Sequence, residues 1–212
     1  MGMQISSLDL ERHCRIYCRP IHTGFGQITV RPISPSDADL AQAFVTGLSG
    51  TSRYFRFFQS LRCLSPAMLD RFTRIDHVTH MALTGVVDLD GTQTMVAEAR
   101  YAVDGDGTSA EIALAVTDRW QRRGIASEMM TMLERIAAAA GIARLSGECL
   151  AVNEGFVGLA RSIGFQVRSD ASDRSLLQIE KRIGKDSQIW SASSRPFFKG
   201  AEPMSAAAST VI

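Results

Sequence analysis

The chain has 212 residues, which fits one domain with extensions, and 45% of them are hydrophobic, which allows a sizeable core and argues against global disorder. Its 23 Lys and Arg residues nearly balance 22 Asp and Glu residues, so no basic excess exists for general nucleic-acid binding. No apolar run approaches the roughly 18 residues that span a membrane, and charges interrupt the N-terminus where a signal peptide is apolar. We therefore expect a cytoplasmic protein with reduced cysteines and neither a nucleic-acid nor a membrane partner.

The first 26 residues are expected to form an N-terminal extension. Within it, His13, Cys14, Cys18 and His22 have side chains that suit zinc, but their spacing is weak evidence for a metal site. We favour a strand or loop that leads into the domain, and we expect no metal. The alternating pattern of residues 27–33 then predicts the first strand.

Three helices are expected after this strand. Residues 35–49 place apolar side chains at helical spacing behind a serine cap. Residues 51–58 and 65–76 predict two shorter helices, each of which opens with Thr or Ser as a cap.

The first short helix has two interpretations. The one that we favour buries Tyr54, Phe57 and Phe58 in the core and leaves the arginines in water. The alternative is that Arg53, Tyr54 and Arg56 line a groove for an acceptor substrate.

The pattern then changes to the period of strands. Residues 80–88, 93–103 and 108–117 predict three antiparallel strands, because Asp-Gly turns separate them. A long amphipathic helix follows from Ile125 and stops at Gly141.

The last elements are a strand over residues 143–151, a helix over 153–164 and a strand over 175–183. The order of elements predicts an α+β (mixed α/β) domain with a central sheet over residues 27–183. Residues 184–212 are rich in Ser and Ala, and we expect a flexible C-terminal tail.

The stretch DRWQRRGIASEMM, residues 118–130, crowds arginines around Gly124 where the long helix begins. A strand that feeds a short loop and then a helix leaves free backbone N–H groups, which form an anion site with the helix dipole. Gly124 lets the backbone approach a phosphate closely, and Ala126 keeps the next turn small. Arg122 and Arg123 add positive charge.

The motif Gln/Arg-x-x-Gly-x-Gly/Ala is met by Gln121, Gly124 and Ala126, but the match alone is weak. An ordinary Arg-rich helix cap is the interpretation that the loop by itself favours. The preceding strand, the long helix and Asn153 at the start of the next helix favour the anion site.

With these features, residues 110–167 resemble the coenzyme A-binding half of the GNAT acetyltransferase superfamily. The resemblance implies a mostly antiparallel sheet of six to seven strands flanked by helices, with acetyl-CoA as co-substrate. It implies that the loop holds the pyrophosphate, while the preceding strand and the next helix hold the pantetheine arm. The residues thereby assigned to acetyl-CoA are Leu114, Val116, Gln121, Arg122, Arg123, Gly124, Ile125, Ala126 and Asn153.

Residues 30–58 and 64–83 resemble the GNAT domains of bacterial protein lysine acetyltransferases, which acetylate a lysine of acyl-CoA synthetases. Residues 77–80 depart from the more acidic stretch expected there. The resemblance implies an enzyme whose partner is a protein of the acyl-CoA synthetase type. A small-amine acetyltransferase and a non-catalytic acetyl-CoA sensor remain the alternatives.

Acetyl transfer to lysine requires a base, because an amine with a pKa of about 10.4 is protonated at pH 7. Glu111 is the candidate, because it lies on the strand that enters the anion loop and the family places its base there. A bulge in this strand, usual in the family, would alter which way Glu111 faces. A solvated strand residue is the alternative, and Glu98 and Glu148 are competing carboxylates. No general acid is assigned, since Ala160 occupies the position of the tyrosine that many family members use.

Overall fold

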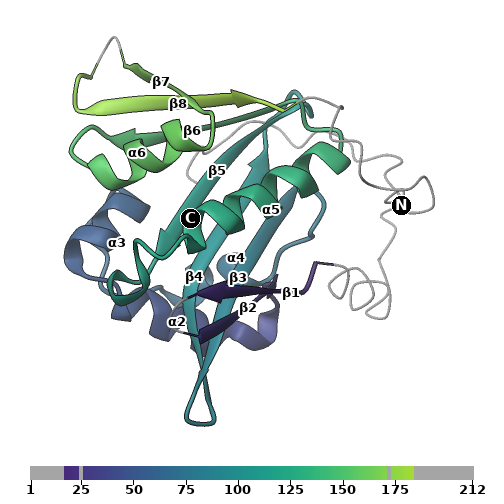
Figure 1. Cartoon of the computed structure of the whole chain (residues 1–212), viewed down its shortest axis with the longest axis vertical. Helices are drawn as coiled ribbons and strands as arrows, with labels where there is room; N and C mark the ends of the chain where they lie inside the picture. The colour runs from purple at the N-terminus through teal and green to yellow at the C-terminus, as the bar shows by residue number, and fades with distance from the viewer. Residues whose placement is uncertain (1–16, 24–25, 171–172, 184–212) are drawn as a thin grey trace.

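An eight-stranded sheet with helices on both faces is formed by residues 17–23, 26–170 and 173–183, which the computed structural model describes (Figure 1). The strand order is β1-β2-β3-β4-β5-β6-β8-β7, and all neighbours are antiparallel except β5 and β6. The strands are β1 Arg19–Thr23, β2 Gly26–Pro32, β3 His80–Leu89, β4 Thr92–Val103, β5 Ser109–Val116, β6 Arg144–Leu150, β7 Gln166–Ser169 and β8 Leu176–Arg182.

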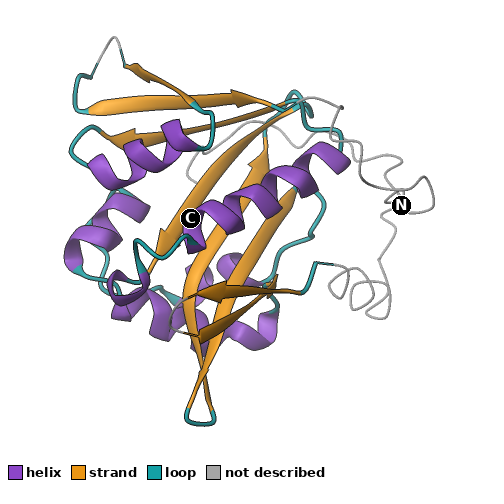
Figure 2. Cartoon of the chain, in the orientation of Figure 1, coloured by secondary structure: helices purple, strands orange, loops and turns teal. Residues whose placement is uncertain are grey.

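The helices form a layer on each face of the sheet (Figure 2). One layer holds α2, α3 and α4, and the other holds α5 and α6. Short 3-10 turns, η1 and η2, precede α2 and α5. The bounds are η1 Pro35–Asp37, α2 Ala38–Gly47, α3 Gly50–Phe57, α4 Pro66–Thr73, η2 Asp118–Trp120, α5 Ile125–Ala139 and α6 Glu154–Ser162.

The expected α+β fold is confirmed, with eight strands in place of six to seven. One additional strand, β1, lies inside the expected N-terminal extension and pairs with β2 from Arg19 to Thr23. It buries Ile21 alone, so it has little of the apolar alternation that predicts a strand. The four-residue β7 buries no side chain, so no apolar alternation marks it in the sequence.

Two apolar clusters hold the layers to the sheet. On one face, Met129, Leu133 and Ile136 of α5 lie at helical spacing and pack against the sheet, as their periodicity predicts. On the other face, Phe44 of α2 and Phe72 of α4 are fully or almost fully buried. The sheet is thus covered on both sides, and its strands carry apolar residues on both faces.

The favoured interpretation of α3 is wrong. Arg56 is buried, at 6% exposure, whereas Tyr54 and Phe58 are 47% and 42% exposed. Of the three aromatic residues, Phe57 alone is buried. The reversal arises because Arg56 finds a buried carboxylate partner, Glu98, on β4, which compensates for its removal from water.

The strands β5 and β6 separate along their length. Their parallel pairing runs only from Ser109 to Glu111 on β5, so the rest of β5 has no partner on that side. Gly147 lies at the point of separation, where a Cβ atom would come 3.2 Å from the carbonyl oxygen of Ile112. A residue without a side chain is needed here because the two backbones approach so closely.

The bulge that is usual in the family is not observed in β5. The pairing of β4 with β5 is continuous from Ala97↔Val116 to Val103↔Ala110. The irregularity lies one strand away, where the register of β3 and β4 shifts between Gly85 and Val86. The alternation of side chains along β5 is therefore the one that the sequence predicts.

Part of the sequence analysis falls outside the described residues. His13 and Cys14 of the weak zinc pattern, and the C-terminal tail, lie there. Within residues 17–23, 26–170 and 173–183, no group of His, Cys, Asp and Glu is placed to hold a metal ion. None of the helices described in these ranges combines the length and the apolar character of a membrane span.

Candidate functional site

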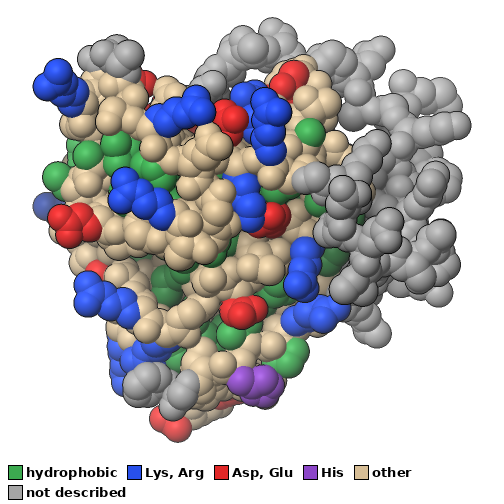
Figure 3. Space-filling view, turned by 45° about the horizontal axis from the view of Figure 1, so that its top comes forward, with side chains coloured by type: hydrophobic (Ala, Val, Ile, Leu, Met, Phe, Trp, Pro, Cys, Tyr) green, Lys and Arg blue, Asp and Glu red, His purple; other side chains and the backbone are tan. Residues whose placement is uncertain are grey.

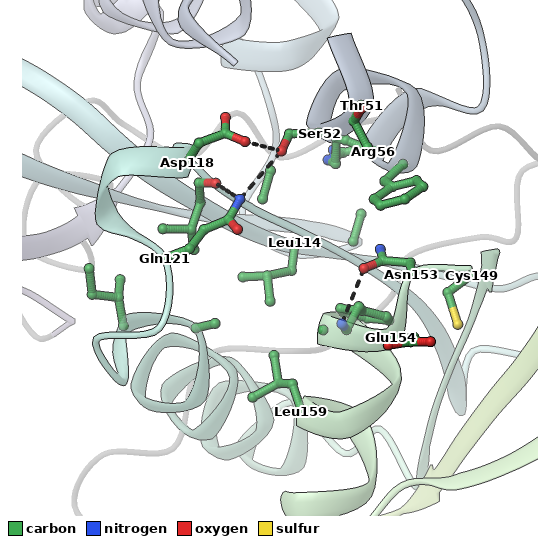
Figure 4. Close-up of a pocket in the computed structure, with 18 of the residues that line it drawn as sticks. Thr51, Ser52, Arg56, Leu114, Asp118, Gln121, Cys149, Asn153, Glu154 and Leu159 are labelled. Carbon is green, nitrogen blue, oxygen red and sulfur yellow. Dashed lines mark hydrogen bonds between the residues drawn. The ribbon is translucent and has the colours of Figure 1, made fainter. Parts of the chain in front are cut away.

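A cavity of about 690 Å³ opens where β5 and β6 separate (Figure 4). Its walls come from α3, from β5 and the loop after it, from the first turn of α5, and from the end of β6 with the start of α6. Nearly all the residues that the sequence assigns to catalysis or to acetyl-CoA line this cavity: Glu111, Leu114, Val116, Gln121, Arg122, Gly124, Ile125, Ala126 and Asn153.

The loop between β5 and α5 has a backbone that suits an anion. Arg122 and Gly124 both have positive φ, at 58° and 79°, so the chain bends tightly around them. Gly124 is the N-cap of α5 and provides no side-chain cap. The first intrahelical bond runs from the Glu128 N–H to the Gly124 carbonyl over 3.1 Å. The N–H groups of the first turn therefore suit a negatively charged ligand.

The side chain of Gln121 fixes the shape of this loop. Its Nε2 donates to the Val116 carbonyl over 3.0 Å and to Ser52 Oγ over 3.3 Å (Figure 4). The first bond closes the loop onto the end of β5, and the second joins it to α3. The side chain of the motif glutamine is thus hydrogen-bonded to the end of β5 and to α3.

Asp118 makes a second link between the loop and α3. Its carboxylate accepts hydrogen bonds from Ser49 N at 3.0 Å, Ser49 Oγ at 2.8 Å and Ser52 Oγ at 2.8 Å. Burial alone would raise the pKa of Asp118, but these hydrogen bonds lower it below its ordinary value. Ser49 is also the N-cap of α3. No local sequence pattern indicates this link, because the partners lie 66 and 69 residues apart.

The two arginines of the loop have different positions. Arg122 is exposed and lines the cavity. Arg123 does not line it, and its guanidinium lies 5.1 Å from the centre of the Trp120 ring. Arg123 is the one residue assigned to acetyl-CoA that this structure places outside the cavity wall formed by the described residues.

Asn153 stands at the start of α6, as expected. Its side-chain oxygen accepts a hydrogen bond from Phe156 N over 3.2 Å and so caps the helix. This bond fixes the orientation of the side chain on the cavity wall. Further along α6, Ala160 is buried in the core, and the Ser162 hydroxyl donates to the Leu159 carbonyl over 2.7 Å.

Glu111 lies at the last paired position of β5, immediately before the strands separate. It is half-buried on the sheet face opposite Ile112, which belongs to the α5 side of the core. Burial raises the pKa of Glu111, and the neighbouring carboxylates Glu148 and Asp104 raise it further, while Arg56 opposes them. A carboxylate with a raised pKa at a cavity wall is suited to accept a proton near neutral pH.

The competing carboxylate Glu98 has a different environment. It is fully buried and bonded to Arg56 and Arg100. Burial would raise the pKa of Glu98, but these two guanidinium groups lower it below its ordinary value. Glu98 also does not line the cavity. A carboxylate so strongly held in its ionised form is poorly suited to proton transfer, which leaves Glu111 as the better candidate.

The surface charge agrees with the balanced composition. On the face that Figure 3 presents, Lys and Arg side chains are interspersed with Asp and Glu, and they do not form one continuous basic surface there. The positive charge that the loop offers an anion is therefore local.

The chain is similar in sequence and fold to known proteins. A sequence profile described as the Acetyltransferase (GNAT) family matches residues 52–165. Acetyltransferase PA5475 of Pseudomonas aeruginosa is 29% identical over 146 residues, which are 69% of this chain and 78% of that protein. Acetyltransferase Pat of Mycolicibacterium smegmatis is 30% identical over 125 residues, which are 58% of this chain but only 37% of Pat.

The crystal structure of the GNAT domain of S. lividans PAT matches with a TM-score of 0.71 and 26% identity, over 79% of this chain and 97% of that domain. The structure of yncA from Salmonella typhimurium, which contains acetyl-CoA, shares the fold with a TM-score of 0.58 and 15% identity, over 76% of this chain and 96% of that chain. Since the family profile covers more than half of the sequence, this chain belongs to the GNAT family of acetyltransferases.

Proposed function

We propose that the protein transfers the acetyl group of acetyl-CoA to a lysine side chain of another protein, with Glu111 as the general base. As a member of the GNAT family it is an acetyltransferase, and enzymes of this family use acetyl-CoA. The observation that carries the proposal is the single cavity that combines the anion loop, the unpaired edge of β5 and the carboxylate of Glu111.

The described residues fit acetyl-CoA along the length of β5. The loop at Gly124 suits the pyrophosphate, because its helix N–H groups have no side-chain cap. The backbone at Leu114 and the N–H of Val116 have no partner on β6 and can pair with the amide groups of the pantetheine arm, while the Val116 carbonyl accepts from Gln121. From Val116 back to Glu111 the strand spans about 17 Å at 3.3 Å per residue. That span puts the carboxylate at the end of the cavity farthest from the anion loop.

The chemistry assigned to the chain has two parts. Glu111 takes a proton from the acceptor ammonium, directly or through water, so that the amine can attack. A backbone N–H on the unpaired edge of β5 around Leu114 donates a hydrogen bond to the oxyanion of the tetrahedral intermediate. Both groups lie on one rigid strand, so their spacing is set by the backbone.

A protein lysine as acceptor is supported by similarity to the Pat proteins, whose GNAT domain this chain resembles at 26% and 30% identity. The test is incubation of the full chain and acetyl-CoA with acyl-CoA synthetases and a panel of small amines, with thiol release and mass spectrometry as readouts. We expect a synthetase lysine to be modified faster than any small amine. Faster turnover of polyamines or antibiotics would establish a small-amine acetyltransferase, and tight acetyl-CoA binding without turnover would favour a sensor.

A further inference from the structure

Two exposed apolar side chains flank the cavity. Phe58 follows the last residue of α3 and is 42% exposed, and Val152 lies between β6 and α6 and is 74% exposed. Both line the cavity. The described residues expose four large hydrophobic side chains, so two of the four are gathered at this site. Apolar surface that is kept exposed at a binding cavity indicates a ligand with an apolar part.

Of the two, Phe58 lies at the acceptor end. The start of α3 is tied to the anion loop through Ser49 and Asp118. From there the eight residues of α3 run about 12 Å at 1.5 Å per residue, so Phe58 lies at the far end of the helix. Val152 lies two residues beyond the end of β6, past the point where β6 separates from β5, so it belongs to the opposite wall of the cavity and not to the end at Glu111.

The same end of the cavity is acidic. Glu148 lines the cavity with Glu111 and is near enough to raise the pKa of Glu111. The one arginine from α3 that lines it, Arg56, is paired with the buried Glu98. This arrangement complements a ligand that carries an ammonium group next to apolar side chains.

The chain itself contains a segment of this composition. Of its 23 basic residues, three are lysines, namely Lys181, Lys185 and Lys199. Lys181 is engaged, since Nζ donates to Glu134 Oε2 at 2.7 Å and to the Ile163 carbonyl at 2.8 Å. Lys199 directly follows two phenylalanines in the sequence Arg-Pro-Phe-Phe-Lys-Gly, residues 195–200, whereas Lys185 stands between glycine and aspartate.

The position of Ile183 gives this segment access to the cavity. Ile183 N donates to the Ala143 carbonyl over 2.9 Å, so the described chain ends beside the start of β6. Glu148 lies four residues along β6 from Arg144, a span of about 13 Å. Lys199 lies 16 residues beyond Ile183, and a chain of that length extends to at most about 53–58 Å. The extended length of the chain from Ile183 to Lys199 therefore exceeds the distance from Arg144 to Glu148 several-fold.

We propose that residues 196–200 of the same chain dock at the acceptor end of the cavity, with Phe197 and Phe198 against Phe58, and that Lys199 is acetylated there. This rests on the proposed function. The Lys199 ammonium gives one proton to Glu111, and the resulting amine attacks the thioester carbonyl. The C–N bond forms, the C–S bond breaks, and coenzyme A leaves as the thiol, so the reaction yields acetyl-lysine, the thiol and one released proton. A tethered acceptor has an effective concentration in the millimolar range, which favours it over a dilute free lysine.

The test uses the full chain and acetyl-CoA, with mass spectrometry of Lys185 and Lys199 over time at several protein concentrations. We expect acetylation of Lys199 in preference to Lys185, with a half-time that does not change on dilution. Phe58→Ser should slow it at least tenfold. Leu89→Ser is the matched control, because Leu89 is also 42% exposed but lies on the β3–β4 turn, and it should leave the rate unchanged.

A second readout needs no acetyl-CoA. Hydrogen exchange should show protection of the amides of residues 197–200 in the wild type and its loss in Phe58→Ser. Equal slow labelling of both lysines that persists in Glu111→Gln would mark uncatalysed chemistry and overturn the proposal. A half-time that shortens in proportion to protein concentration would mark transfer between chains and would also overturn it. If synthetase lysines are acetylated and Lys199 is not, this inference fails alone; if no lysine of any kind is acetylated, the proposed function fails with it.

Discussion

Arg56 and Glu98 form a buried ion pair between α3 and β4, in which the Arg56 Nε donates to Glu98 Oε2 over 3.1 Å and the side chains are 2% and 0% exposed. Arg100 bonds the same carboxylate and lies with its guanidinium 4.0 Å from the centre of the Phe72 ring. Two buried cations thus share one anion. The stability that this carboxylate contributes is present at neutral pH and is lost only as the pH falls through the lowered pKa of Glu98.

Glu98→Gln should strongly destabilise the protein, because it leaves two buried guanidinium groups without a counter-charge. Breaking a buried pair by removing one partner costs about 3–5 kcal/mol, which urea unfolding will measure. Asp70→Asn is the matched control, since the Arg74–Asp70 pair has a 2.8 Å separation but side chains that are 67% and 59% exposed. We expect it to cost less than about 1 kcal/mol. Equal decreases in the free energy of unfolding of the two variants would show that the buried ion pair stabilises the protein no more than the exposed one.

Glu111→Gln should lower kcat by about 10²–10⁴-fold while leaving the dissociation constant of acetyl-CoA unchanged. The affinity is preserved because the anion loop lies at the other end of β5. Because burial raises the pKa of Glu111, wild-type activity should fall with decreasing pH at a higher pH than for an ordinary glutamate. Steady-state kinetics and calorimetry provide the two measurements. Near-full activity of the variant at pH 7, where chemistry limits the rate, would remove Glu111 as the base.

Glu148→Gln should move the acid limb of the kcat profile to lower pH. Glu148 raises the pKa of Glu111, second only to burial, so its neutralisation lets Glu111 remain ionised at lower pH. The profile is measured at saturating acceptor, which separates this effect from any loss of acceptor affinity. Glu128→Gln, on the exposed face of α5, is the control and should leave the limb in place. An acid limb that is unchanged, or that shifts to higher pH, in Glu148→Gln would contradict the assignment of Glu111 as the base.

Gly124→Glu should weaken acetyl-CoA binding, because it places bulk and negative charge where the pyrophosphate is assigned. The substitution also strains the backbone, since Gly124 has a φ of +79°. Gly107→Glu controls for that strain. Gly107 has a φ of +68° and, like Gly124, open space around its Cβ position, but it lies on the β4–β5 turn. Calorimetry should show lost affinity for the first variant and intact affinity for the second; unchanged affinity in a folded Gly124→Glu protein would refute the site.

The sequence predicts those parts of the fold that local patterns encode. The three strands from His80 to Val116 and the helix from Ile125 were placed within a few residues, because Asp-Gly turns and helical periodicity are short-range signals. β1 and β7 were missed because they bury almost no apolar side chains. α3 was misread because the burial of Arg56 depends on a partner 42 residues away. Pairings at that distance have no local signature.

The candidate site likewise has parts that local sequence patterns indicate and parts that depend on contacts between distant residues. The anion loop and Glu111 were identified from residues close together in the chain, and the structure places them in one cavity. The walls contributed by α3 and by Val152 were not identified, because they belong to segments brought together only by the sheet topology. Ser49 and Ser52 are ordinary helix-start residues in the sequence, and only their contact with Asp118 reveals a further role.

The attachment of α3 to the anion loop limits how the enzyme can be re-engineered. Ser49 and Ser52 hold Asp118, and Ser52 also holds Gln121, so one helix start anchors the first half of the loop at two points. A chimera that imports α3 from a relative to change acceptor choice would cut these bonds unless both serines are retained. Grafts that keep residues 49–52 and exchange only the second half of the helix should preserve coenzyme affinity. Acceptor preference can therefore be varied independently only through the half of α3 that lies farther from the loop.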